Sequence, residues 1–197
     1  MKNFYLILSC CALFSLTAHS ENFSGDDFNG AWESDGGNQK VQPVGWHALS
    51  CNASGVFGSM KGGTVTKGGD ESDASPIIEN IFAGSKGSWM TTGYVIPGIL
   101  SLGNPWIYVD TNYFTAAKGD LGVDGGVEFT GRPSKITFKA QYYNAPTSDI
   151  DDAAHIKVYL WKGSAESTDK SGANHTDEMS AVLAGNAGAT LIGSGEL

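Results

Sequence analysis

Two aromatic residues in the C-terminal part of the chain have the spacing of a ligand platform. Tyr159 and Trp161 are two positions apart in the segment HIKVYLWK, and Lys157 precedes them at the same spacing. Side chains two apart in an extended strand point to the same face. Rings on a solvated sheet face can stack on the apolar side of a pyranose, so this pattern is typical of sugar-binding sheets. The alternative is that a helix following Thr176 covers this face and makes the rings part of the core.

Four further side chains are candidates for contact with a sugar. Trp46, Trp89 and Trp106 each lie near an expected turn, where they would serve either as core residues or as secondary platforms. Arg132 is the only arginine and stands between a glycine and a proline. Its guanidinium could bind a carboxylate or a set of sugar hydroxyls through two hydrogen bonds, or it could pin a loop.

The residue pattern supports binding better than catalysis. Glycoside hydrolysis or a lyase reaction would need two facing carboxyl groups, and the acids available are Asp110, Asp124, Glu128, Asp149, Asp151 and Asp152. Their spacing does not show which of them converge. The histidines at 47, 155 and 175 are too dispersed for a zinc signature. Neither a Gly-x-Ser-x-Gly elbow nor a phosphate-binding glycine loop occurs.

Two other groups of reactive side chains have simple interpretations. Asp70, Glu71 and Asp73 are close together and could offer oxygens to calcium, but the complete EF-hand pattern is missing and a solvated acidic loop is the default interpretation. Cys51 has His47 four residues before it, which is weak evidence for a nucleophile and base. A buried, inert thiol is the simpler interpretation.

Strands must position these side chains. Apolar residues alternate with polar ones from Ile136 to Tyr142 and again from Ile156 to Trp161, which is the pattern of strands with one buried face. The segment 144–152 between them contains a proline and three aspartates and is expected to be a loop. We therefore predict two long antiparallel neighbours within 127–162.

The rest of the chain also favours strands and turns. With 27 glycines, 6 prolines and 11% aromatic residues, the composition fits many short strands joined by glycine turns. The expected strands include 77–82, 88–96, 106–115 and 189–197, and a shorter one near Trp32. Polar loops or turns are expected at 61–75, around a short strand at 64–66, and at 118–126. One short helix is expected near 176–185, capped by Thr176 and ended by Gly185.

The first twenty residues predict export. A positive charge at Lys2, an apolar run from Phe4 to Leu16 and small residues at Ala18 and Ser20 form a secretory signal peptide, with cleavage expected before Glu21. We expect a secreted, periplasmic or outer-surface protein with one domain, 21–197; lipoprotein anchoring at Cys10 is the alternative. No other segment is apolar enough to span a membrane. The net charge of −9 excludes nucleic acid as a partner, because its binding requires cationic side chains.

The phrase VEFTGRPSKITFKAQYY, the aspartate-rich break, HIKVYLWKG and the later IGSGEL resemble the carbohydrate metabolism domain (PCMD) family of secreted and surface proteins of Bacteroidetes. The resemblance spans roughly 28–197 and is strongest in its second half, where Phe129 to Pro133 carry most of it. It implies an antiparallel β-sandwich of jelly-roll type, similar to carbohydrate-binding modules, and a link to glycan use. Members usually continue with further strands, so the resemblance implies that the last strands of the sandwich are missing here.

Three hypotheses about function follow from these observations. The first is a secreted domain that binds a polysaccharide or oligosaccharide without catalysis and without a cofactor, calcium being a weak alternative. The second is a glycoside hydrolase or lyase that uses two of the acids named above. The third is a surface-structural or adhesive module with protein partners.

Overall fold

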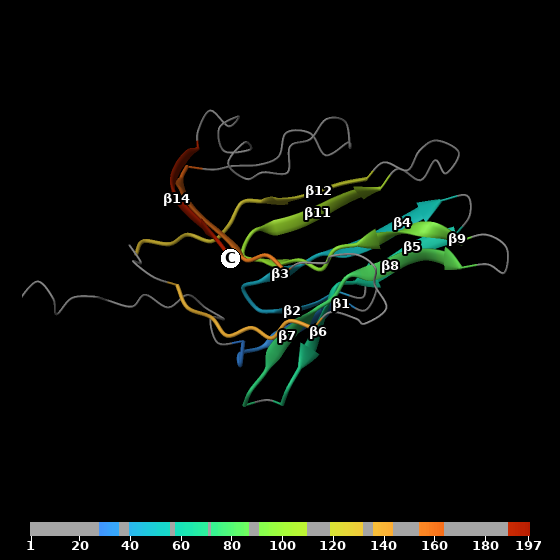
Figure 1. Cartoon of the computed structure of the whole chain (residues 1–197), viewed down its shortest axis with the longest axis horizontal. Coiled ribbons are helices and arrows are strands. Elements are labelled where there is room, and N and C mark those ends of the chain that lie inside the picture. Colours follow the sequence, from blue (N-terminus) through green and yellow to red (C-terminus); the bar gives the residue numbers. More distant parts are fainter. Residues whose placement is uncertain are drawn as a thin grey trace, which may run out of the picture. The chain divides into compact units, whose positions relative to one another are not determined.

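The computed structural model describes residues 28–35, 40–55, 58–70, 72–86, 91–109, 119–131, 136–143, 154–163 and 189–197 (Figure 1). The chain divides into two compact units. One consists of Met1–Phe23 and Glu128–Tyr143, and the other of Ser24–Val127 and Asn144–Leu197. All the strands of the described residues belong to the second unit.

The described residues form strands and no helix, so the predicted all-β class is confirmed for them. The strands are Trp32–Asp35 (β1), Lys40–Pro43 (β2), His47–Ala48 (β3), Ser50–Gly55 (β4), Gly58–Gly63 (β5), Val65–Gly68 (β6), Ser75–Ile78 (β7), Ile81–Lys86 (β8), Thr91–Ile96 (β9), Leu100–Ser101 (β10), Asn104–Val109 (β11), Gly119–Asp124 (β12), Lys157–Lys162 (β13) and Thr190–Glu196 (β14). The helix predicted at 176–185 and the signal peptide at 1–20 lie outside the described residues.

Most strands pair with a neighbour in the sequence as antiparallel hairpins: β1 with β2, β4 with β5, β6 with β7, β8 with β9, and β11 with β12. This is the pairing expected when a short connection joins two strands. The exceptions connect distant parts of the chain: β3 pairs with β10, and β13 pairs with β14. Figure 1 shows the β6–β7 and β11–β12 hairpins as pairs of neighbouring strands.

Four residues that interrupt the strands join the hairpins to one another. Leu49 separates β3 from β4, Thr64 separates β5 from β6, and Glu79 follows β7, while Ile99 precedes β10. The Leu49 N–H donates to the Ile99 carbonyl at 3.0 Å, the Thr64 N–H to the Leu49 carbonyl at 3.2 Å, and the Glu79 N–H to the Thr64 carbonyl at 2.9 Å. At each of these positions the backbone therefore forms a hydrogen bond to another segment, at the point where the chain passes from one strand pair to the next.

The side chain of Thr64 strengthens this junction. It is 1% exposed, and its hydroxyl donates to the Leu49 carbonyl at 2.8 Å while accepting from the Ile99 N–H at 3.4 Å. A buried hydroxyl is tolerated where it has partners of this kind.

The apolar core lies beside the same junction. Leu49, Cys51 and Ile96 are buried, and the partly buried residues packed against them are Ile81, Ile99 and Ile107. Cys51 is 1% exposed. The structure thus confirms that Cys51 is a buried core thiol, and a nucleophilic role with His47 is not favoured.

Several sequence-based predictions about strands are wrong. The strand predicted at 77–82 is interrupted at 79–80, and its residues belong to β7 and β8, which pair with different strands. The loop predicted at 61–75 contains the end of β5 and the whole of β6. Residues 136–143 form no strand, and Ile136, Phe138 and Tyr142 are exposed; the partner of β13 is β14 instead. The alternating pattern specifies two faces but not a partner strand. The predicted turn at 118–126 is largely strand β12, which pairs along its whole length with β11. Glycine and aspartate have low strand propensity, but the partner strand β11 supplies the aromatic and β-branched residues that favour a strand.

Candidate functional site

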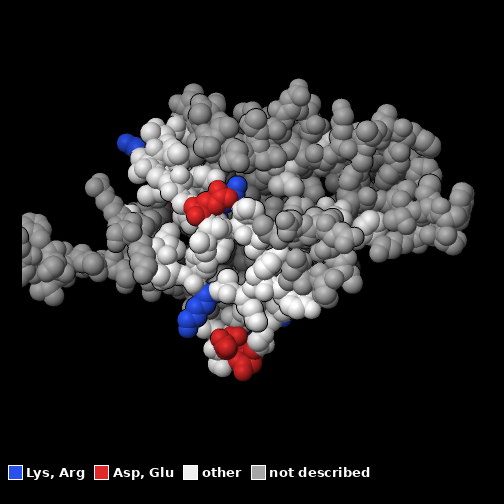
Figure 2. Space-filling model, in the orientation of Figure 1, with Lys and Arg blue, Asp and Glu red and all other residues white. Residues whose placement is uncertain are grey.

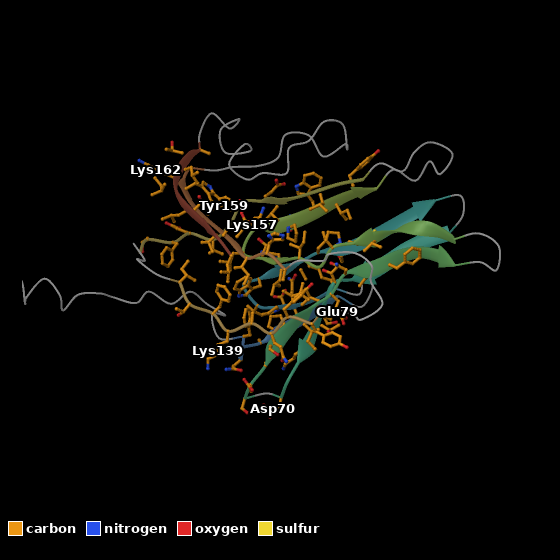
Figure 3. The ribbon with its side chains drawn as sticks, viewed as in Figure 1. Asp70, Glu79, Lys139, Lys157, Tyr159 and Lys162 are labelled. Atoms are coloured by element: carbon orange, nitrogen blue, oxygen red, sulfur yellow. The ribbon has the colours of Figure 1, made fainter. Side chains whose placement is uncertain are left out.

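The candidate face is built by the antiparallel pair β13–β14. Lys157, Tyr159 and Trp161 lie on one face of β13, opposite Glu196, Ser194 and Leu191 of β14. A register shift between Leu160 and Trp161 places Ile192 as the extra residue of a bulge. Figure 3 shows Lys157 and Tyr159 along β13, with Lys162 toward its far end. The strand predicted at 156–161 is thus confirmed, together with the shared face of its two aromatic residues.

Trp161 is partly buried because its ring packs against the chain that follows β12. A Cβ atom placed on Gly126 would lie only 2.9 Å from the Trp161 Cη2 atom and 3.3 Å from Cζ2. Glycine at 126 therefore allows the ring edge to approach the backbone closely. The contact fixes the ring from one side, so Trp161 acts at least partly as a packing residue.

Tyr159 is partly exposed and stands between the packed Trp161 and a group of charged side chains. Glu196 Oε1 lies 3.1 Å from His155 Nδ1 and 3.5 Å from Lys157 Nζ. All three side chains are well exposed, so these pairs contribute little to stability. They do place a donor and an acceptor on the same face as the Tyr159 ring, opposite which Ser194 adds a hydroxyl.

Trp46 belongs to a different aromatic cluster. Its ring centroid lies 5.2 Å from that of Phe28 with the planes tilted by 48°, and the Trp32 Nε1–H donates to the Phe28 carbonyl at 3.0 Å. Lys67 Nζ lies 5.8 Å from the Trp32 ring centroid, within reach of a cation–π interaction. Phe28 has φ 58°, a conformation rarely adopted by a bulky residue. All three rings are partly buried, which fits a packing role.

The backbone before Trp46 is closed by a turn. The Trp46 N–H donates to the Pro43 carbonyl at 3.0 Å, and Gly45 takes φ 87°, which glycine adopts without strain. Buried Gln42 accepts from the Ala48 N–H at 3.0 Å and donates to Glu33 at 3.1 Å. The sequence predicts a turn near Trp46, and the structure confirms it. The contact between Trp46 and Phe28 is not predicted, because the two residues are 18 positions apart and no local pattern connects them.

Trp106 packs across its own hairpin. It is opposite Gly122, and a Cβ placed there would be 2.7 Å from the Trp106 Cζ2 atom. An aromatic side chain covering a cross-strand glycine is a known way to stabilise such a pair. Tyr108, on the same face of β11, is 37% exposed. Trp106 is therefore a packing residue, while Trp89 and Arg132 lie outside the described residues.

The predicted acids are not assembled into a site by the described residues. Asp124 is 8% exposed at the end of β12, and Glu128 is an exposed residue of the other unit. The other four predicted acids, Asp110, Asp149, Asp151 and Asp152, lie outside the described residues. Within the described part of the chain, no three histidine, cysteine or acidic side chains come together in a way that could hold a metal ion.

Asp70 uses its carboxylate to hold its own loop. Its Oδ1 accepts from the Ser72 hydroxyl at 2.7 Å, the Ser72 N–H at 2.9 Å and the Asp73 N–H at 3.0 Å. These bonds, led by the one from the Ser72 hydroxyl, lower the pKa of Asp70 below its usual value. Figure 2 shows acidic side chains at this tip of the β6–β7 hairpin, and Figure 3 labels Asp70 there. The geometry is that of a loop held by its own aspartate.

Comparison with known proteins yields no relative: no family model matches the chain, and no curated protein and no solved structure matches it. The described part of the chain contains no helix that could cross a membrane. The function must therefore be argued from the residues themselves.

Proposed function

We propose that this chain is a secreted carbohydrate-binding module without catalytic activity, and that its strands form an antiparallel β-sandwich of jelly-roll type. Its contact face is the side of β13 that carries Lys157, Tyr159 and Trp161. The predicted signal peptide supports export, and the resemblance of 127–162 to the carbohydrate metabolism domain family supports the sandwich and the link to glycans.

The observation that carries the proposal is the position of Tyr159. Its ring is partly exposed on a strand face, in the same row as a Trp161 ring that packs against Gly126. The Gly126 contact restricts the Trp161 ring, and a restricted ring loses little entropy when a sugar stacks on it. Glu196, Ser194 and Lys157 around the two rings supply the hydrogen-bond acceptors and donors that fix the orientation of sugar hydroxyls.

The hydrolase alternative needs two carboxyl groups at opposite sides of a cleft. Of the acids predicted for that role, only Asp124 and Glu128 are among the described residues, and they belong to different units. No specific observation favours hydrolysis over binding, and none favours an adhesive module with protein partners.

The test is to replace Tyr159 by alanine and to measure binding of soluble polysaccharides by affinity electrophoresis and calorimetry. Loss of a stacked ring is worth about 1 kcal/mol, so we expect Kd to rise roughly 5- to 10-fold. Tyr143→Ala is the matched control, because Tyr143 is 82% exposed in the other unit and should leave Kd unchanged. We also expect EDTA to leave binding unchanged, since no metal is part of the proposed site.

Two results would contradict the proposal. The first is that the folded wild-type protein binds no polysaccharide in a broad panel. The second is that Tyr159→Ala and Tyr143→Ala have the same effect on Kd. Release of reducing sugar from a bound polymer would instead favour the hydrolase.

A further inference from the structure

Beside Tyr159, the carboxylate of Glu196 lies close to two basic side chains, those of His155 and Lys157. Glu196 Oε1 lies 3.1 Å from His155 Nδ1 and 3.5 Å from Lys157 Nζ. Glu196 and Lys157 are directly opposite each other in the register of β13 and β14, on the face that carries Tyr159. This pairing depends on the ladder, which continues beyond Glu196 through reciprocal hydrogen bonds between Ile156 and Leu197 at 2.9 and 3.0 Å.

The pairing determines how the face would treat a charged ligand. With neutral histidine, the charges of Lys157 and Glu196 cancel at short range. A sugar carboxylate arriving at Tyr159 would meet a lysine whose charge is already balanced, and a carboxylate next to it. The whole chain adds to this effect, because a net charge of −9 repels anions at longer range.

Neutral sugars do not meet this obstacle. Their hydroxyls both donate and accept, so they can use the acceptor oxygens of Glu196, the donors of Lys157 and the hydroxyl of Ser194 without displacing the ion pair. Recognition of a neutral sugar on the Tyr159 face would depend on ring stacking and hydrogen bonds.

We infer that the Tyr159 face takes neutral polysaccharides in preference to acidic ones, and that Glu196 sets this preference by balancing Lys157. The inference rests on the proposed function. Glu196 is thus assigned a role in specificity: it disfavours uronic acid-type ligands while serving as an acceptor for neutral hydroxyls.

The experiment compares polymers that differ only in charge. Soluble β-glucan, galactomannan and pullulan are each used in native form and after selective oxidation of the C6 hydroxymethyl groups to carboxylates. Affinity electrophoresis and calorimetry at low salt give Kd for each pair. For the wild type we expect the oxidised form of a bound polymer to bind at least about 5-fold more weakly, and this ratio to shrink when salt screens the charges.

Glu196→Gln tests the assigned residue. It keeps a hydrogen-bonding side chain and removes the charge that balances Lys157, so the ratio of the Kd of the oxidised polymer to the Kd of its native form should fall about 3- to 10-fold. Glu128→Gln is the matched control, because it changes the net charge equally in the other unit. Adding Lys157→Gln to Glu196→Gln should cancel this fall in the ratio. Melting temperatures confirm that each variant is folded.

The outcomes separate the inference from the proposed function. If no polymer binds in either form, the proposed function fails and the inference fails with it. If wild type binds an oxidised polymer as tightly as the native one, or more tightly, the inference is overturned while glycan binding stands. If Glu196→Gln and Glu128→Gln lower the ratio equally, net charge alone is responsible and the role of Glu196 is refuted.

Discussion

Single side chains of this protein perform local tasks that their residue types alone did not reveal. Asp70 lies in an acidic loop that invites a calcium hypothesis, yet its carboxylate is occupied by Ser72 and by the Asp73 N–H. Trp161 is on the face expected from its spacing, but Gly126 decides how far its ring is exposed. The role of each of these side chains therefore depends on the residues that contact it as well as on its own type.

The Asp70 loop leads to a prediction about pH. Because the pKa of Asp70 is lowered on folding, its ionised form stabilises the native state at pH values above the usual aspartate value of about 4. That contribution is lost as the pH falls through the lowered pKa. Asp70→Ala should therefore lower the melting temperature at neutral pH, and the difference from wild type should shrink below about pH 4.

Asp70→Asn provides the control for this experiment. Asparagine keeps an acceptor oxygen for the Ser72 and Asp73 N–H groups but does not titrate. It should retain part of the stability at neutral pH. A difference between wild type and Asp70→Ala that stays constant from neutral to acidic pH would contradict the proposed role of the carboxylate.

At the scale of strands, the residues between consecutive strands join the hairpins to one another. Leu49, Thr64 and Ile99 each lie between two strands, and hydrogen bonds among them link segments that pair with different partners on either side. The core residues Cys51 and Ile96 lie within three residues of Leu49 and Ile99 in the sequence. Loss of a hydrogen bond at this junction should therefore destabilise several hairpins together.

Thr64→Val tests this junction. Valine has nearly the same shape, but it leaves the Ile99 N–H without the hydroxyl acceptor and removes the donor to the Leu49 carbonyl. A buried hydrogen-bonding group left unsatisfied costs about 1–3 kcal/mol. We expect Thr64→Val to reduce the free energy of unfolding by about this amount, measured by denaturant titration.

Thr64→Ser is the companion variant. Serine retains the hydroxyl and loses only a methyl group, whose burial is worth about 0.8 kcal/mol. The valine variant should therefore be the less stable of the two, although it preserves more apolar volume. Equal stability of the two variants, or a more stable valine variant, would show that packing and not the hydroxyl holds the junction.

At the scale of the whole molecule, export is the property that the first twenty residues predict. The protein expressed with its full sequence in a Gram-negative host should be recovered outside the cytoplasm, with Glu21 as its N-terminal residue by mass spectrometry. Replacing Ser20, the residue before the cleavage point, by tryptophan should leave the signal peptide attached. Retention in the cytoplasm would contradict the prediction, and a lipid-modified N-terminus at Cys10 would support the lipoprotein alternative.

The sequence by itself determined the properties that depend on local chemistry. Alternation over Ile156 to Trp161 identified β13 and the shared face of Tyr159 and Trp161, because a two-residue period is a property of one strand. The abundance of glycine and aromatic residues indicated the all-β class of the described residues. The apolar character of cysteine was enough to predict that Cys51 is buried.

Only the tertiary structure decided which segments meet. The alternation at 136–142 is as regular as that of β13, yet residues 136–143 form no strand, since a strand exists only with a partner and β13 pairs with β14. The glycines and aspartates of β12 predict a turn, but β12 forms a strand because it pairs with β11 along its whole length. The approach of Glu196 to Lys157 and of Trp161 to Gly126 followed from that pairing and packing, because long-range contacts depend on register and three-dimensional proximity, which no local pattern encodes.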